Sequence, residues 1–127
     1  MAKPQPKGVL SFERINSLIT VQRNKNLRNE MNNENRINLY DVGDFWVAFE
    51  KSAYLLKQMV NDDDEPIILH FRDYPFPIIM HSVHYELVNE MCQKRIMTKR
   101  TLEYLQFMTK PIDEESYKVW YRELVLD

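Results

Sequence analysis

Cysteine, glycine and long apolar runs are all scarce in this sequence of 127 residues. The single cysteine, Cys92, excludes an internal disulfide and is typical of a reducing compartment. No apolar run approaches the roughly 20 residues that span a bilayer, and the first residues lack the hydrophobic segment of a secretory signal. The length suits a single folded domain. We therefore expect a cytoplasmic protein with no membrane partner.

Motifs that carry catalytic chemistry are also missing. The sequence has no G-x-x-x-x-G-K-[ST], so it lacks a phosphate-binding loop, and it has no G-x-S-x-G, CxxC or HExxH. His81 and His84 are three residues apart, as some helical metal ligands are, but no further histidine or cysteine completes a set. We therefore expect no enzymatic activity, and no bound nucleotide, cofactor or metal.

Charge is unevenly distributed along the chain. The whole chain carries a net charge of −2, whereas residues 1–40 hold seven basic and three acidic residues, a balance of +4 that leaves −6 for the remainder. Because phosphate neutralisation dominates affinity for nucleic acids, only this first third offers a basic face.

The most informative stretch is NLYDVGDFWVAFEKSAYLLKQM at residues 38–59. Its first residues are apolar and β-favouring, and Gly43 tolerates the positive φ of a sharp corner. Asp44 is a good helix N-cap. Apolar residues then recur at helical spacing, at Phe45, Phe49, Ala53, Leu56 and Met59. The pattern predicts a strand, a glycine turn and then an amphipathic helix that begins at Asp44.

This stretch, together with PIILHFRDYPFPIIMHSVHYELVNEM, resembles the N-terminal mismatch-recognition domain (domain I) of the MutS family of DNA mismatch repair proteins. The resemblance covers roughly residues 37 to 95 and implies that Gly43, Asp44, Phe45 and Arg72 contact DNA, with Phe45 stacking on a mispaired base. The family's hydrogen-bonding Glu is replaced by Val47, and its glycine-rich hairpin is shortened to HFRDYPFP. The resemblance therefore supports the fold more strongly than mismatch discrimination, and a Phe at this position is more often a core residue.

The first 36 residues are expected to form a basic segment outside the MutS-like domain of residues 37–127. Prolines and lysines in residues 1–10 indicate a mobile arm, and apolar spacing predicts a helix over about 12–23. Seven asparagines in residues 24–38 indicate a loop, either alone or with a frayed helix. Arg23, Lys25 and Arg28 are candidate phosphate contacts, although a solvated loop is the commoner role.

The second half reads as a hairpin followed by helices. Residues 67–71 and 78–80 are predicted strands joined by a turn at RDYPFP, and a helix over 83–94 is capped by Ser82. The densest basic cluster of the chain consists of Lys94, Arg95, Lys99 and Arg100. It is either a phosphate-contacting edge or a soluble turn, which is commoner, and residues 95–97 suggest a short strand. The 101–108 segment fits either a helix or a strand, and we favour the helix. Asp113 caps a final helix over 114–125, whose aromatic stripe of Tyr117, Trp120 and Tyr121 suits core packing or a partner surface.

These features predict an α/β fold with a small mixed β-sheet of three to five strands flanked by helices. Three functions remain open at this point. The first is a stand-alone MutS domain I-like module that binds mismatched or damaged duplex DNA without ATPase activity. The second is an adaptor that kept the fold and binds other protein subunits. The third is a metal-dependent hydrolase that uses the acids at 62–65 or the histidines.

Overall fold

The computed structural model describes residues 7–60 and 64–126. This part of the chain forms five helices and six strands. In chain order they are α1 (Lys7–Ile19), α2 (Arg23–Met31), β1 (Arg36–Asp41), β2 (Trp46–Phe49), α3 (Glu50–Met59), β3 (Ile67–Phe71), β4 (Tyr74–Val83), α4 (Tyr85–Lys94), β5 (Met97–Arg100), β6 (Tyr104–Met108) and α5 (Glu114–Leu126).

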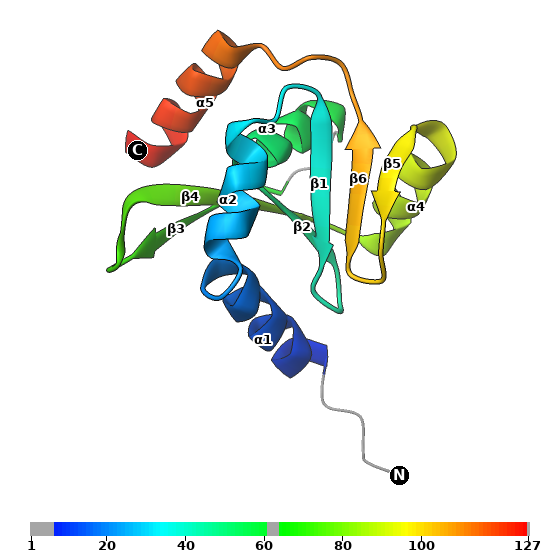
Figure 1. Ribbon diagram of the computed structural model, residues 1–127, viewed down its shortest axis with the longest axis horizontal. Coiled ribbons are helices and arrows are strands. Elements are labelled where there is room, and N and C mark those ends of the chain that lie inside the picture. Colours follow the sequence, from blue (N-terminus) through cyan, green and yellow to red (C-terminus); the bar gives the residue numbers. More distant parts are fainter. Residues whose placement is uncertain (1–6, 61–63, 127) are drawn as a thin grey trace.

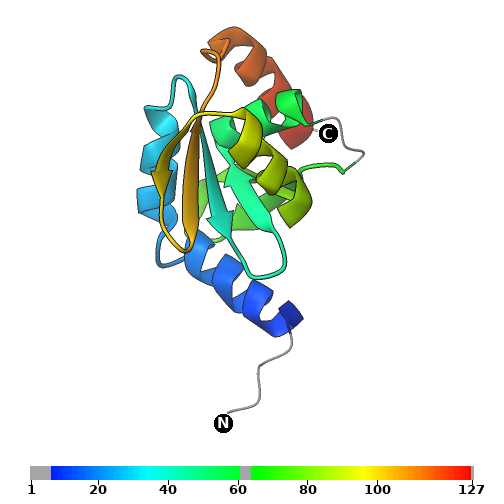
Figure 2. The same ribbon diagram turned by 90° about the vertical axis from the view of Figure 1, so that its right-hand side faces the viewer.

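All six strands form one sheet in the order β3-β4-β2-β1-β6-β5 (Figure 1). Every neighbouring pair is antiparallel. Helices α1 and α2 lie on one side of the sheet, and α3, α4 and α5 lie on the other (Figure 2). The α1 and α2 pair does not extend over the front of β6 and β5 (Figure 1).

Two apolar clusters fill the two sides of the sheet. Ile37, Leu39 and Phe107 belong to the cluster beneath α3, α4 and α5. Tyr40 and Val47 belong to the cluster beneath α1 and α2. Successive residues of a strand point to opposite faces, so a strand that is covered on both sides must be apolar at nearly every position. This requirement explains why β2, with the sequence WVAF, is buried throughout.

The expected α/β class is confirmed, with a sheet flanked by helices on both sides. The sheet differs in detail from the expectation, because it has six strands rather than three to five and is antiparallel rather than mixed.

The predicted corner at Gly43 is a hairpin turn between two strands and not a junction between a strand and a helix. Gly43 has a φ of 101°, as expected, and the Val42 amide donates to the Phe45 carbonyl at 3.0 Å. The helix begins only at Glu50, so Asp44 is not its cap, and the N-cap position is held by Phe49 without a side-chain hydrogen bond. The predicted start of the helix at Asp44 is wrong because a strand that is buried on both faces is also a continuous apolar run, and residues 46–49 form such a strand.

The predicted asparagine-rich loop is also wrong in its first half, where α2 forms. Its asparagines make tertiary hydrogen bonds that the local propensity does not capture. Asn26 Nδ2 donates to the Leu18 carbonyl at 3.0 Å, which fixes α2 against α1. Residues 1–6 of the expected arm lie outside the described residues, and its last residues are the start of α1.

Further differences concern the second half of the chain. The 101–108 segment is not a helix, because residues 104–108 form β6, and Pro75 and Pro77 lie within β4 rather than in a turn. Helix α4 has His84 rather than Ser82 at its N-cap. The β3–β4 hairpin is confirmed, and so is the cap of α5, where Asp113 Oδ1 accepts the Ser116 amide at 3.4 Å. Asp62 and Asp63, half of the acidic stretch at 62–65, lie outside the described residues.

Candidate functional site

A polar groove of about 490 Å³ runs between the α1–α2 pair and the uncovered part of the sheet. One wall comes from α1, α2 and the turn between them, and the rest comes from β1, β5, β6 and the β5–β6 turn. We call it the cationic groove. Its lining residues are Arg14, Gln22, Lys25, Asn26, Asn29, Tyr40, Lys99, Thr101, Glu103, Tyr104 and Gln106.

Positive charge exceeds negative charge in this groove. Three cations, Arg14, Lys25 and Lys99, face one anion, Glu103. Arg14 is partly neutralised, because its Nη2 lies 3.0 Å from Glu103 Oε2 and its Nε donates to the Asp41 carbonyl at 3.0 Å. Among residues 7–60 and 64–126, neither Lys25 nor Lys99 forms an ion pair. The groove thus carries about +2 in a chain whose net charge is −2.

The sheet side of the groove is a connected array of hydrogen bonds. Gln106 Nε2 donates to Asn38 Oδ1 at 2.9 Å and to the Tyr104 hydroxyl at 3.1 Å. Thr98 Oγ1 donates to Gln106 Oε1 at 2.9 Å. The rings of Tyr40 and Tyr104 lie beside each other with centroids 5.3 Å apart, and burial raises the pKa of both hydroxyls. Both tyrosines are therefore neutral hydrogen-bonding groups at physiological pH.

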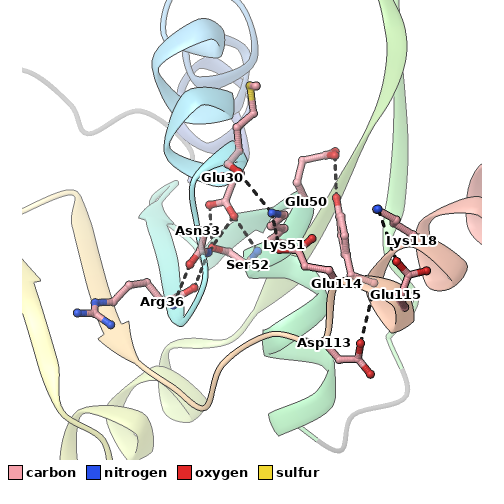
Figure 3. Close-up of polar contacts among 12 residues, drawn as sticks. Glu30, Asn33, Arg36, Glu50, Lys51, Ser52, Asp113, Glu114, Glu115 and Lys118 are labelled. Atoms are coloured by element: carbon pink, nitrogen blue, oxygen red, sulfur yellow. Dashed lines mark hydrogen bonds and ion pairs between the residues drawn. The ribbon is translucent and has the colours of Figure 1, made fainter.

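This array continues into the protein through the buried carboxylate of Glu30, on α2 (Figure 3). Glu30 Oε2 accepts hydrogen bonds from Asn38 Nδ2 at 2.9 Å and from Ser52 Oγ at 2.7 Å. Glu30 Oε1 accepts the Ser52 amide at 2.8 Å and Asn33 Nδ2 at 3.3 Å. Burial raises the pKa of Glu30, and these donors oppose the rise. Glu30 and these four donors form a buried hub that joins α2, β1 and α3. The hub positions α2, which forms part of one wall of the cationic groove.

The three predicted phosphate contacts on α2 have different environments. Lys25 lines the groove, as described, and Arg28 is exposed one turn further along the helix. Arg23 instead makes a two-fold hydrogen bond to Asp73, with both N–O distances 2.9 Å, and its guanidinium lies over the rings of Phe71 and Tyr74. The hydrogen bond from Arg23 lowers the pKa of Asp73. Arg23 is therefore a structural link between α2 and the β3–β4 hairpin.

Lys94 and Arg95 lie in the opposite helical layer. They are at the end of α4 and line a separate hollow of about 320 Å³ with Met59 and Val60. The sheet lies between them and α2 (Figure 2). The second predicted basic cluster is therefore divided, because Lys99 lines the cationic groove together with Lys25, whereas Lys94 and Arg95 lie on the other side of the sheet.

The residues matched to the MutS family are also dispersed. Gly43, Asp44 and Phe45 form the β1–β2 turn, where the Tyr85 hydroxyl donates to the Gly43 carbonyl at 3.0 Å. Phe45 is half-buried and packs against the cluster beneath α1. Val83, at one end of β4, pairs with Trp46 beside this turn, whereas Arg72 precedes the other end of β4. Arg72 is thus remote from Phe45 (Figure 1).

The aromatic stripe of α5 faces its own domain. Tyr117 and Trp120 both make edge-on ring contacts with Tyr54 of α3. Trp120 and Tyr121 pack against the core cluster and are half-buried, and the Tyr121 hydroxyl donates to the Pro77 carbonyl at 2.5 Å. Only part of each ring is therefore exposed to a partner.

A second hollow, of about 460 Å³, lies along α5 and is lined in part by Glu50, Tyr117 and Tyr121. Glu50 Oε1 accepts the Ile79 amide at 2.7 Å, and Glu50 Oε2 accepts the Tyr117 hydroxyl at 3.2 Å. Burial raises the pKa of Glu50 to about 7. Glu50 also has a φ of 49°, which is uncommon outside glycine. Glu50 is thus a carboxyl group of raised pKa beside a hollow, and its side-chain partner there is the Tyr117 hydroxyl.

Sequence reasoning identified Lys25 and Lys99 as members of two separate basic clusters, but it missed the rest of the groove. Arg14, Lys99, Tyr104 and Gln106 come together only when β1, β6 and α1 are assembled, and they are far apart along the chain. One usable signal was the alternation in residues 104–108, which gives Tyr104 and Gln106 a polar face opposite Leu105 and Phe107.

No group of three histidine, cysteine, aspartate or glutamate side chains within 7–60 and 64–126 is placed to hold a metal ion. In the same ranges no helix has the length and apolar character needed to cross a bilayer. Comparisons with protein-family models, with curated proteins and with solved structures found no match.

Proposed function

We propose that this chain is a nucleic-acid-binding module of MutS domain I-like type, and that its phosphate-binding site is the cationic groove. The observation that carries the proposal is the convergence of Arg14, Lys25 and Lys99 on one polar groove in an otherwise acidic chain. Neutralisation of phosphates by Lys and Arg supplies most of the non-specific affinity for nucleic acids.

The groove's other groups suit the same ligand. Amides and hydroxyls, such as those of Asn29 and Thr101, hydrogen-bond phosphate and sugar oxygens in many complexes. Two unpaired lysines predict weak, salt-sensitive binding, which fits a module that acts within a larger assembly.

The proposal does not include mismatch discrimination. Val47 replaces the family's glutamate on β2, which lies between β1 and β4, and its side chain is fully buried in the cluster beneath α1 and α2. It has no hydrogen-bonding group and does not reach solvent. We therefore expect similar affinity for matched and mismatched duplexes.

An adaptor function is the second candidate, and it has less structural support. Its main support is the aromatic stripe of α5 as a partner surface, but these side chains pack on α3 and β4 of the same chain.

The test is fluorescence anisotropy of labelled duplexes, one matched and one with a single G·T mismatch, from low to moderate salt. Lys25→Glu and Lys99→Glu should each weaken binding to both duplexes and lower the slope of log affinity against log salt by about 1 or more. Lys110→Glu is the matched control, because Lys110 is exposed and outside the groove.

Lys94→Glu tests the other basic cluster, on the opposite side of the sheet. Weakening by Lys94→Glu alone would move the interface to α4 and contradict the groove. Flat titrations of the wild-type protein at low salt would reject nucleic-acid binding and favour the adaptor.

A further inference from the structure

Among residues 12–60 and 64–126, Leu102 is the most exposed large apolar residue, with 94% of its surface accessible. It lies in the β5–β6 turn, between Thr101 and Glu103, and both neighbours line the cationic groove. Leu102 contributes almost nothing to the cores, so packing does not explain an apolar side chain at this position.

The turn that carries Leu102 is held in place by several contacts. The Thr101 amide donates to the Tyr104 carbonyl at 2.8 Å, and the Glu103 amide donates to Thr101 Oγ1 at 3.3 Å. The Glu103 carbonyl accepts the Asp41 amide at 2.9 Å, which ties the turn to β1, and the Glu103 side chain pairs with Arg14. Leu102 is therefore presented on a fixed support rather than on a loose loop.

We infer that Leu102 is an apolar wedge that contacts the bases of a nucleic acid whose phosphates lie in the cationic groove. The inference rests on the proposed function. Proteins that deform nucleic acids commonly insert Leu, Ile, Phe or Met between base steps, beside cationic side chains that hold the backbone. Leu102 lies three residues after Lys99 and directly precedes Glu103, whose side chain pairs with Arg14.

The assignment moves the wedge away from Phe45. Phe45 is half-buried and packs against the cluster beneath α1. Its ring could therefore stack on a base only by giving up this packing. The two turns are neighbours, because Asp41 at the start of one bonds to Glu103 in the other (Figure 1). The wedge role therefore remains at the same end of the sheet but is taken by a side chain that is free to insert.

The first experiment compares Leu102→Ala with wild type on a duplex that carries 2-aminopurine at a flexible TA step. Leu102→Ala should weaken binding roughly tenfold, which corresponds to about 1.4 kcal/mol, and should abolish the rise in 2-aminopurine fluorescence that unstacking produces. The salt slope should not change, because no charge is removed. Leu102→Phe should retain both affinity and the fluorescence rise.

Leu126→Ala is the matched control, because Leu126 is another exposed leucine, on α5 in the other helical layer. If Leu102→Ala binds and unstacks as wild type does, while Lys25→Glu and Lys99→Glu weaken binding, the wedge is overturned and the groove stands. If the wild type binds no duplex, both are overturned. If Leu102→Ala abolishes association with a protein partner and leaves nucleic-acid binding intact, Leu102 is a protein contact and the wedge is again overturned.

Discussion

The hydroxyl of Tyr117 on α5 donates a hydrogen bond of 3.2 Å to Oε2 of Glu50, the first residue of α3. The same carboxyl group accepts the Ile79 amide of β4 through Oε1 at 2.7 Å. One side chain thus links the last helix, the central helix and the sheet. Lys51, the next residue, makes a parallel link through its 2.9 Å ion pair with Glu114 (Figure 3).

Because burial raises the pKa of Glu50 from 4.5 to about 7, folding should depend on pH. Between these two values the folded state holds a proton that the unfolded state has lost. The contribution of Glu50 to the free energy of unfolding is therefore fully present below about pH 4.5 and is lost as the pH rises to about 7. The full loss corresponds to roughly 3 kcal/mol at most.

Glu50→Gln removes this titration and retains an acceptor for the Ile79 amide. In urea unfolding at pH 5, 6, 7 and 8, the free energy of unfolding should fall less steeply with pH in the variant than in the wild type. Glu30 also has a raised pKa and contributes in the same direction in both proteins, so the difference between them isolates Glu50. Equal pH slopes for the two proteins would contradict a raised pKa at Glu50.

The buried hub at Glu30 predicts a large effect from a small change. Ser52→Ala removes a hydroxyl that donates to Glu30 Oε2 at 2.7 Å and accepts the Asn38 amide at 2.9 Å. Buried groups that lose their partners cost about 1–3 kcal/mol, so urea unfolding at pH 7 should show a loss of that size. Ser82→Ala is the control, because no hydrogen bond of its hydroxyl occurs among the described residues. Equal losses of unfolding free energy in Ser52→Ala and Ser82→Ala would contradict a stabilising role for the hydrogen bonds around Glu30.

Local signals in the sequence predicted the elements more reliably than the site. Glycine at a positive φ marked the turn at Gly43, and Asp113 with the aromatic stripe marked α5. Helical spacing after Asp44 failed because β2 is buried on both faces, and the asparagines of α2 were misread because Asn26 bonds to a carbonyl of another helix. The cationic groove joins Arg14 to Lys99 across the sheet, and such a long-range pairing leaves no local pattern.

Phe45 offers the sharpest comparison between the structure and the resemblance to the MutS family. Phe45→Ala removes half-buried packing against the cluster beneath α1, and we expect a loss of about 2 kcal/mol, below the roughly 3–5 kcal/mol of a fully buried Phe. Phe76→Ala is the matched control, because Phe76 is 61% exposed and should cost much less.

Phe45→Leu separates packing from stacking at the same position. Leucine keeps most of the apolar contact but lacks the aromatic face on which a base stacks, so a packing residue should tolerate it. We expect Phe45→Leu to bind labelled duplex as tightly as the wild type in the anisotropy assay, with most of its stability retained. A fall in affinity of tenfold or more, with stability preserved, would return the base-stacking role to Phe45 and place the wedge on the β1–β2 turn rather than at Leu102.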